Sequence, residues 1–184
     1  MPYEIELRRE REGADIYREI EAYLVFGLYP EVLGLGSAAE KKAFIIKRIG
    51  TFSGNLRSEI SKSAKYYFCD VGVRNAVIND FRPIQLRNDV GALWKNFVVM
   101  ELLKKYEYEH RYANFYFWRT YDQKELDLVI EGNGALSGYE IKWRDSPAKV
   151  PKLWLDTYKS EVRVITKEPL PAVLEPYTLP GQKI

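Results

Sequence analysis

Three charged residues interrupt two short apolar runs in the C-terminal half of the chain. Asp127 lies within KELDLVI (residues 124–130), and Glu140 and Lys142 lie within GYEIKW (residues 138–143). Both runs have the length and the β-rich composition of strands. Two carboxylates and an ammonium group in such runs need an explanation, because a charge is costly to bury unless it is paired.

The spacing of these residues predicts that they meet, since side chains alternate between the two faces of a strand. In the first run, Glu125, Asp127 and Val129 are expected on one face. The opposite face is assigned to the core and carries Leu126, Leu128 and Ile130. In the second run, Glu140 and Lys142 share a face. If the two strands pair, the two carboxylates and the lysine converge on one side of a sheet.

Two carboxylates and a lysine at one place can hydrolyse a phosphodiester. Mg²⁺ prefers oxygen ligands and keeps several waters, so Asp127 and Glu140 could hold it beside a phosphate. The metal would lower the pKa of a bound water and stabilise charge on the phosphate. Lys142 would orient or deprotonate that water, with Glu125 as an auxiliary acid. The alternative is an ordinary solvated ion pair on a strand face, worth less than about 1 kcal/mol.

The elements around these residues predict an α/β fold. Asn88 or Asp89 can cap a long apolar helix that runs to Leu103. Strand patterns follow at residues 113–119, 124–130, 138–143 and 161–166, with a helical pattern, PKLWLDTYKS, between the last two. The order helix, three strands, helix, strand predicts an α/β sandwich with a mixed central sheet.

The first half of the chain gives weaker signals. Residues 14–26, ADIYREIEAYLVF, have helical periodicity, and AFIIKRI (43–49) fits either a helix or a strand. KYYFCD (65–70) predicts a short strand, and VGVRNAVIN (71–79) a helix or turn.

Composition excludes several classes of protein. The chain has 184 residues, of which 46% are hydrophobic and 29% charged, which suits a soluble globular domain. The single cysteine, Cys69, excludes an internal disulfide framework and favours a reducing, cytoplasmic compartment. The apolar stretches fall short of the roughly 18 residues of a membrane span, so no membrane is expected as a partner. The net charge is only +2, but residues 41–65 carry seven basic and one acidic side chain, either a phosphate contact or a solvated surface.

A resemblance sharpens these expectations. Asp127, followed after 12 residues by Glu140-Ile141-Lys142, resembles the signature of the PD-(D/E)xK nuclease superfamily, which implies a restriction-endonuclease-like αβββαβ core. NLRSEISKSAKYYFCDVGVRNAVI and LRNDVGALWKNFVVMELLK resemble the C-terminal nuclease-like domain of unknown function of many bacterial and archaeal AAA-type ATPases. YREIEAYLVFGLYPEVL resembles a helical segment of the same ATPases. The resemblance implies a helical N-terminal segment at 1–48 and a nuclease-like domain at 49–184.

The chain departs from that family in three respects. It has no G-x-x-x-x-G-K-[ST] motif, so no ATP is expected. GLGSAAEKK runs almost directly into AFIIKRIGTFSGN, so most of the winged-helix segment expected there is missing. The helix that often supplies a further acid, as G-x-x-x-E, reads Gly91-Ala-Leu-Trp-Lys95. A lysine at that position would compete with a metal ion through its positive charge.

Three functions therefore remain open at the level of sequence. The first is a Mg²⁺-dependent DNA nuclease with Asp127 and Glu140 as metal ligands and Lys142 as the catalytic base or charge stabiliser. The second is a catalytically inactive module that keeps the fold and binds DNA or a protein partner, which Lys95 favours. The third is a homo-oligomer that assembles through the N-terminal segment. Arg119 and Lys149 are candidate phosphate contacts, with ordinary surface charges as the alternative.

Overall fold

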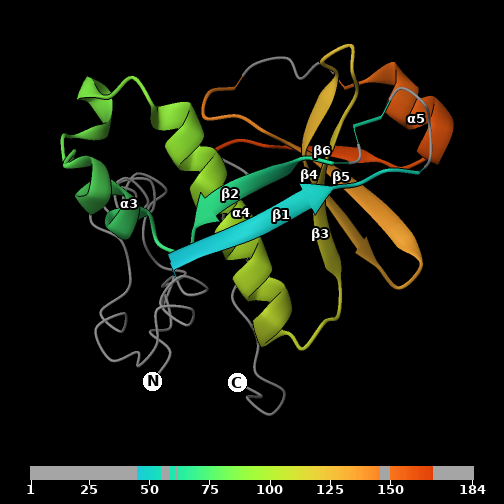
Figure 1. The fold of residues 1–184 in the computed structure, drawn as a ribbon, viewed down its shortest axis with the longest axis horizontal. Coiled ribbons are helices and arrows are strands. Elements are labelled where there is room, and N and C mark those ends of the chain that lie inside the picture. The colour runs from blue at the N-terminus through green and yellow to red at the C-terminus, as the bar shows by residue number, and fades with distance from the viewer. Residues whose placement is uncertain (1–44, 55–58, 61, 146–149, 168–184) are drawn as a thin grey trace, which may run out of the picture.

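The computed structural model describes residues 45–54, 59–60, 62–145 and 150–167, which form a mixed α/β fold around one six-stranded sheet (Figure 1). The strands are β1 (Ile46–Thr51), β2 (Ala64–Phe68), β3 (Asn114–Arg119), β4 (Glu125–Gly132), β5 (Ala135–Ile141) and β6 (Val162–Ile165). The helices are α3 (Val71–Ile78), α4 (Val90–Tyr108) and α5 (Lys152–Tyr158), with a 3-10 turn, η2 (Ile84–Leu86).

The sheet has the strand order β2-β1-β3-β4-β5-β6. The pairs β1–β2, β3–β4 and β4–β5 are antiparallel, whereas β1–β3 and β5–β6 are parallel. The predicted mixed α/β fold is therefore confirmed, and the ambiguous run AFIIKRI contributes a strand. β1 and β2 extend the sheet beyond β3, which the sequence did not indicate.

Two apolar cores lie on opposite faces of this sheet. Helix α4 covers one face, where Leu93, Trp94 and Val98 are fully buried against side chains of β4 and β5. Helix α5 covers the other face, where Trp154 packs edge-on against Trp118 of β3 at a ring-centroid distance of 5.5 Å. Burying each such side chain stabilises the fold by roughly 1.5–3 kcal/mol. The sheet is thus held between two helices that constrain the ends of β4 and β5.

The pairing of β3 with β4 contains a β-bulge. The paired residues on either side of it are Tyr116 with Val129, and Trp118 with Leu126. Phe117 therefore opposes two residues of β4, Asp127 and Leu128. A bulge of this kind breaks the alternation of side chains and often redirects one of them.

The bulge changes the face of the sheet to which residues of β4 point, so the predicted faces need correction. Leu126 packs with Val129 in the core under α5, whereas Leu128 and Ile130 pack in the core under α4. The expectation that Leu126 shares a face with Leu128 is wrong, because the extra residue shifts the alternation between them. Asp127 consequently faces α4 together with Leu128, instead of sharing a face with Val129.

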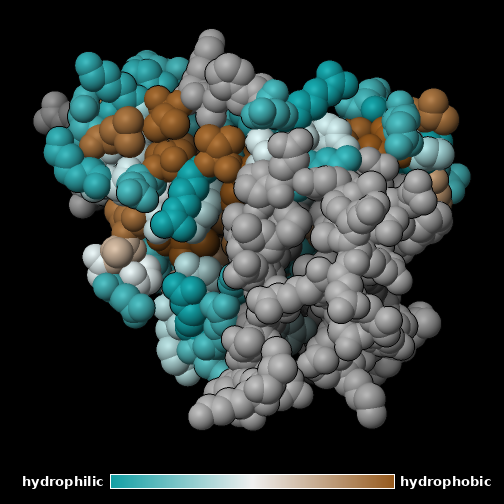
Figure 2. All heavy atoms as spheres, turned by 180° about the vertical axis from the view of Figure 1, so that it is seen from behind, coloured by the Kyte–Doolittle hydropathy of each residue, from teal (hydrophilic) through white to brown (hydrophobic). Residues whose placement is uncertain are grey.

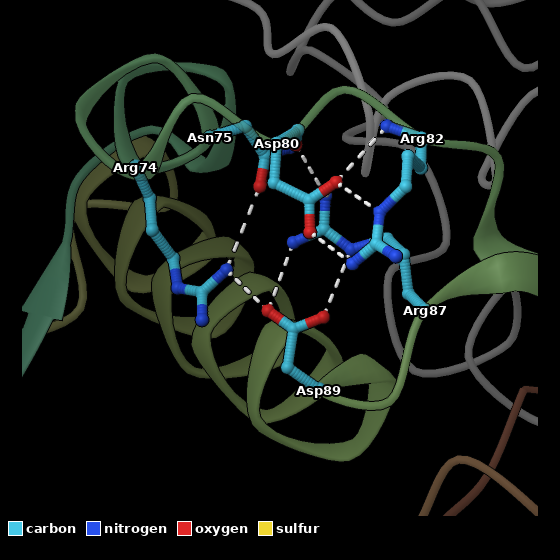
Figure 3. A network of polar contacts seen from close by, with 6 residues as sticks. All are labelled: Arg74, Asn75, Asp80, Arg82, Arg87 and Asp89. Atoms are coloured by element: carbon cyan, nitrogen blue, oxygen red, sulfur yellow. Dashed lines mark hydrogen bonds and ion pairs between the residues drawn. The ribbon is translucent and has the colours of Figure 1, made fainter.

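The connection between α3 and α4 is fixed by a polar network (Figure 3). Arg87, whose side chain is fully buried, donates from Nε and Nη2 to the two carboxylate oxygens of Asp89 at 2.9 and 2.8 Å. Its Nη1 donates to the main-chain oxygen of Asp80, and Arg74 of α3 forms an ion pair with Asp89 at 2.8 Å. The Arg87 hydrogen bonds lower the pKa of Asp89 to about 2. Because Asp89 immediately precedes α4, the network fixes the helix end that carries Lys95.

The described surface is uneven in polarity. Seen from behind, hydrophobic side chains gather on the side of the molecule away from α3, and hydrophilic residues surround them (Figure 2). Leu155 of α5 and Val164 of β6 are exposed by 40% and 37%. Among the described residues, no helix is both long and apolar enough to cross a membrane.

Two sequence predictions concern the N-terminal part of the chain. The expected boundary between residues 48 and 49 falls within β1, whose residues pair with β2 on both sides of it. The helical pattern at 14–26 lies outside the described residues. The division into two units stays a prediction.

Candidate functional site

Asp127 lies where β4 and β5 separate. Main-chain pairing of these strands extends from Gly132 and Ala135 to Leu128 and Tyr139. Just beyond it, the Ile141 N–H donates to Asp127 Oδ2 at 2.9 Å. The side-chain carboxylate thus accepts a hydrogen bond that a main-chain carbonyl would accept in a regular ladder. Asp127 is only 3% exposed, so this bond fixes the orientation of a buried charge.

The second oxygen of Asp127 faces a lysine from α4. Lys95 Nζ lies 2.5 Å from Asp127 Oδ1, and the Lys95 side chain is 36% exposed. The position where a further acid is expected from the sequence therefore holds a cation in direct contact with Asp127. A charge-assisted hydrogen bond of this length is strong where solvent is largely excluded.

A further lysine reaches the same carboxylate from β2. Lys65 Nζ lies 2.5 Å from Glu125 Oε1 and 3.9 Å from Asp127 Oδ1. The ammonium also lies over the Phe117 ring, 4.7 Å from its centroid, and Arg119 Nε lies 3.4 Å from Glu125 Oε2. Sequence reasoning missed Lys65, because its approach depends on β1 and β2 joining the sheet. Its place in the basic block at 41–65 was the only signal.

Glu140 and Lys142 form the predicted pair on β5 and just after it. Lys142 Nζ lies 2.7 Å from Glu140 Oε1. The hydrogen bond that Lys142 donates to Glu140 raises the pKa of Lys142, and the charge of Asp127 raises it further. Lys142 is therefore close enough to respond to both carboxylates. The structure brings Asp127, Glu140 and Lys142 to one end of the β4–β5 pair, but the predicted convergence on one side of the sheet is wrong. Tyr139 and Ile141, which flank Glu140, pack in the core under α4, so Glu140 points away from the helix that Asp127 faces.

The cluster as a whole is balanced by internal ion pairs. It contains four cations and three carboxylates, namely Lys65, Lys95, Arg119 and Lys142 with Glu125, Asp127 and Glu140. Tyr67 of β2 lies close by. Burial raises its pKa, and the charges of Asp127 and Glu125 raise it further. The cluster carries a net charge of +1, four minus three, and all four of its cations are partly exposed.

These side chains do not fit a divalent cation as they are arranged. Asp127 Oδ1 is bonded to Lys95 and Glu140 Oε1 to Lys142, so an ammonium group lies beside each expected ligand. Among the described residues, no group of three or more Asp, Glu, His or Cys side chains could hold a metal ion. Mg²⁺ would need these oxygens free and would be repelled by the neighbouring ammonium groups.

The other candidates lie elsewhere or outside the described residues. Glu101, further along α4, forms an ion pair with Lys104 at 2.7 Å. Arg119 belongs to the cluster through Glu125, whereas Lys149 lies outside the described residues. His110 follows the last turn of α4 with φ +50°, well away from the cluster.

Another buried carboxylate lies on the α5 side of the sheet. Glu59 is 4% exposed and accepts hydrogen bonds from Trp118 Nε1 at 2.6 Å and from the Gly54 N–H at 2.8 Å. The Tyr158 hydroxyl and Ser53 Oγ also donate to it. All four of these donors are neutral. The sequence did not indicate this site, because its donors come from three separate segments.

Comparison with known proteins finds a similarity to a family of unknown function over part of the chain. Residues 90–164 match the family described as "Domain of unknown function (DUF4143)". The match begins with α4 and ends in β6, so it includes Lys95, Asp127, Glu140 and Lys142. The expected similarity to a domain of unknown function is therefore confirmed. The wider assignment to the nuclease superfamily stays a prediction.

Two mycobacterial proteins are similar over a longer stretch. The chain is 28% identical over 108 residues to "Uncharacterized protein Rv2008c" of Mycobacterium tuberculosis and to "Uncharacterized protein Mb2031c" of Mycobacterium bovis. The aligned stretch is 58% of this chain and 24% of each relative, so the chain spans about a quarter of their length. No solved structure shows significant similarity to this chain.

Proposed function

We propose that this domain is a non-catalytic binding module built on a restriction-endonuclease-like core, and that its ligand is the phosphate backbone of DNA. The core is supported by the chain order α4, β3, β4, β5, α5, β6, which is the αβββαβ order of that fold. The contact between Lys95 and Asp127 carries the argument for a non-catalytic role.

The lysine supplies the positive charge that a metal ion would otherwise supply to Asp127. Lys95 Nζ is fixed by a carboxylate that is itself held by the Ile141 N–H. An ammonium group can stabilise a phosphate, but it cannot generate a metal-bound hydroxide. A domain with a lysine in place of the expected acid would therefore bind phosphate without hydrolysing it.

The charge of the cluster supports a phosphate ligand. Lys95 and Lys142 are each 36% exposed and Arg119 is 39% exposed, so each can reach a ligand from its carboxylate partner. Contacts of lysine and arginine with DNA phosphates release counterions, which makes the affinity fall steeply with salt. They carry no sequence information, so we expect little sequence preference.

Fluorescence anisotropy with a labelled DNA duplex over a salt series tests this function. We expect the logarithm of the affinity to fall linearly with the logarithm of the salt concentration, by about 0.9 per phosphate contact. Lys142→Ala and Arg119→Ala should each weaken binding and lower that slope. Arg163→Ala, which removes a surface cation of β6, is the matched control. If the unmodified protein shows no affinity for DNA at low salt, the proposal is contradicted.

Mg²⁺-dependent cleavage of DNA is the second candidate, because Asp127, Glu140 and Lys142 lie at the same end of the β4–β5 pair. It requires Lys95 Nζ to move away from Asp127 Oδ1. A plasmid-nicking assay with Mg²⁺ distinguishes the two functions. Nicking by the unmodified protein that disappears in Asp127→Asn and Lys142→Ala would favour the enzyme and exclude the non-catalytic module.

A further inference from the structure

A cavity of about 420 Å³ opens at the C-terminal end of α4, between that helix and residues of β1 and β3. Its volume lies within the range of small-molecule sites, roughly 300–1,000 Å³. Tyr106, which lines the cavity, lies eleven residues beyond Lys95, or about 16 Å along the helix axis. The cavity is therefore separate from the Asp127 cluster.

The inner surface of the cavity is apolar and aromatic. Ile49 of β1 and Leu103 of α4 line it and are 2% and 5% exposed. Tyr106 and Phe115 also line it and pack edge to face, with ring centroids 5.3 Å apart. Flat aromatic surfaces of this kind accept the face or edge of a planar ligand.

The lining also carries an excess of positive charge. Lys47 of β1 and Arg111 after α4 supply two cations, and Glu107 supplies one carboxylate. Arg48 points to the opposite face of β1, because its partner Tyr66 is exposed whereas Lys47 is paired with the buried Tyr67. The formal charge of Lys47, Arg111 and Glu107 is therefore +1, two minus one. Cations from two separate segments thus meet around one apolar pocket, which favours a ligand that combines an anionic group with an apolar body.

The turn that carries Arg111 is ordered before any ligand binds. His110 adopts a left-handed conformation, and the N–H groups of His110 and Arg111 donate to the carbonyls of Glu107 and Tyr106. These bonds close the end of α4 in a Schellman arrangement. The Arg111 guanidinium lies over the Tyr106 ring at 4.3 Å and pairs with Glu109 at 3.1 Å. Because these contacts already hold the Arg111 side chain, less conformational entropy is lost when a ligand binds.

We propose that this cavity binds a small phosphate monoester with a planar body, of the size of a nucleoside monophosphate. Lys47 and Arg111 hold the phosphate, since charge-assisted hydrogen bonds to phosphate are strong and arginine can make two at once. The planar body lies against Tyr106 and Phe115. Such a ligand would bind beside the end of α4, the helix that also supplies Lys95.

Isothermal titration calorimetry with three probes tests the site on the full chain. The probes are adenosine monophosphate, adenosine and inorganic phosphate. We expect the nucleotide to bind at least about tenfold more tightly than either fragment, because only the nucleotide uses both the cations and the aromatic wall. A tenfold difference corresponds to about 1.4 kcal/mol. Equal affinity for the nucleotide and for inorganic phosphate would overturn the proposal.

Variants locate the binding site. The double variant Lys47→Ala/Arg111→Ala should weaken nucleotide binding about tenfold or more. Arg163→Ala is the matched control, because it removes an exposed cation that does not line the cavity. An equal loss in both proteins would indicate general ionic attraction and would overturn the proposal. Lys95→Met should leave nucleotide binding unchanged, because Lys95 does not line the cavity. If nucleotide binding is not found, the function proposed for the Asp127 cluster is therefore unaffected.

Discussion

Asp127 and Glu59 are both buried carboxylates, but they lie on opposite sides of the sheet and are stabilised differently. Asp127 faces α4 and is paired with the ammonium groups of Lys95 and Lys65. Glu59 lies on the α5 side and accepts hydrogen bonds from the neutral side chains of Trp118 and Tyr158. A buried carboxylate that accepts hydrogen bonds from Trp118, Tyr158 and the Gly54 N–H holds three segments of the chain together. Asp127 is instead paired with partly exposed cations, and these cations can turn from it to a ligand.

The structural role of Glu59 predicts the largest loss of stability. Glu59→Leu leaves the Trp118 and Gly54 N–H groups and the Tyr158 hydroxyl without this acceptor. Each unsatisfied buried donor costs about 1–3 kcal/mol, so we expect a total loss of about 3–4 kcal/mol. Urea denaturation measures it. Glu59→Gln keeps an acceptor oxygen and should lose only about 1–2 kcal/mol. Equal stability of the Leu variant and the unmodified protein would contradict the role.

Removing the other carboxylate should cost less. Asp127→Ala leaves the Ile141 N–H unpaired, but Lys95 and Lys65 can turn toward water, so we expect a loss of about 2 kcal/mol. Asp127→Asn keeps an oxygen for the Ile141 N–H and should be the milder change. Denaturation of both variants checks the order. A greater loss for Asp127→Ala than for Glu59→Leu would reverse the comparison.

The lysine partner of Asp127 should contribute least to stability. Lys95→Met keeps the length of the side chain and removes its charge. Asp127 retains the Ile141 N–H and the ammonium of Lys65 at 3.9 Å. Because Lys95 is 36% exposed, we expect a loss of only about 1 kcal/mol in the free energy of unfolding. A loss as large as that of Glu59→Leu would assign Lys95 a structural role.

Each of the two sites includes a tyrosine with a raised pKa, and the dependence of stability on alkaline pH tests both. Burial, aided by Asp127 and Glu125, raises the pKa of Tyr67, and burial with the Glu59 hydrogen bond raises that of Tyr158. The folded protein keeps these protons above pH 10, where the unfolded chain releases them. Stability is therefore complete below the ordinary tyrosine pKa of about 10 and falls as pH rises above it.

Tyr67→Phe and Tyr158→Phe should each remove one titrating group, so the free energy of unfolding should fall less steeply as pH rises above about 10. The measurement is the free energy of unfolding in urea at a series of pH values above neutrality. A Phe variant whose stability falls as steeply as that of the unmodified protein would show that the replaced tyrosine does not titrate in this way.

The part of the fold from α4 to β6 follows from sequence, because each element has strong local signals. The apolar run after Asp89 predicts α4, and the alternating runs separated by turn residues predict β3, β4 and β5. The pairing of Glu140 with Lys142 also follows, since residues two positions apart along a strand share a face whatever the register. Local periodicity is sufficient for these features.

Features that depend on register could not be predicted. The bulge at Asp127 and Leu128 arises from the pairing of β3 with β4, and it alone decides which side Asp127 faces. Lys65 reaches Asp127 only because β2 joins the sheet through β1, and Glu59 meets donors that are far apart in sequence. No local pattern records these long-range contacts.

Calorimetric titration with Mn²⁺ tests most directly the claim that Lys95 occupies the cation position at Asp127. Mn²⁺ accepts the same oxygen ligands as Mg²⁺. The unmodified protein is predicted to give no saturable binding, whereas Lys95→Glu should bind Mn²⁺ and lose that binding when Asp127→Asn is added. Saturable binding of Mn²⁺ by the unmodified protein that is abolished by Asp127→Asn would contradict the account.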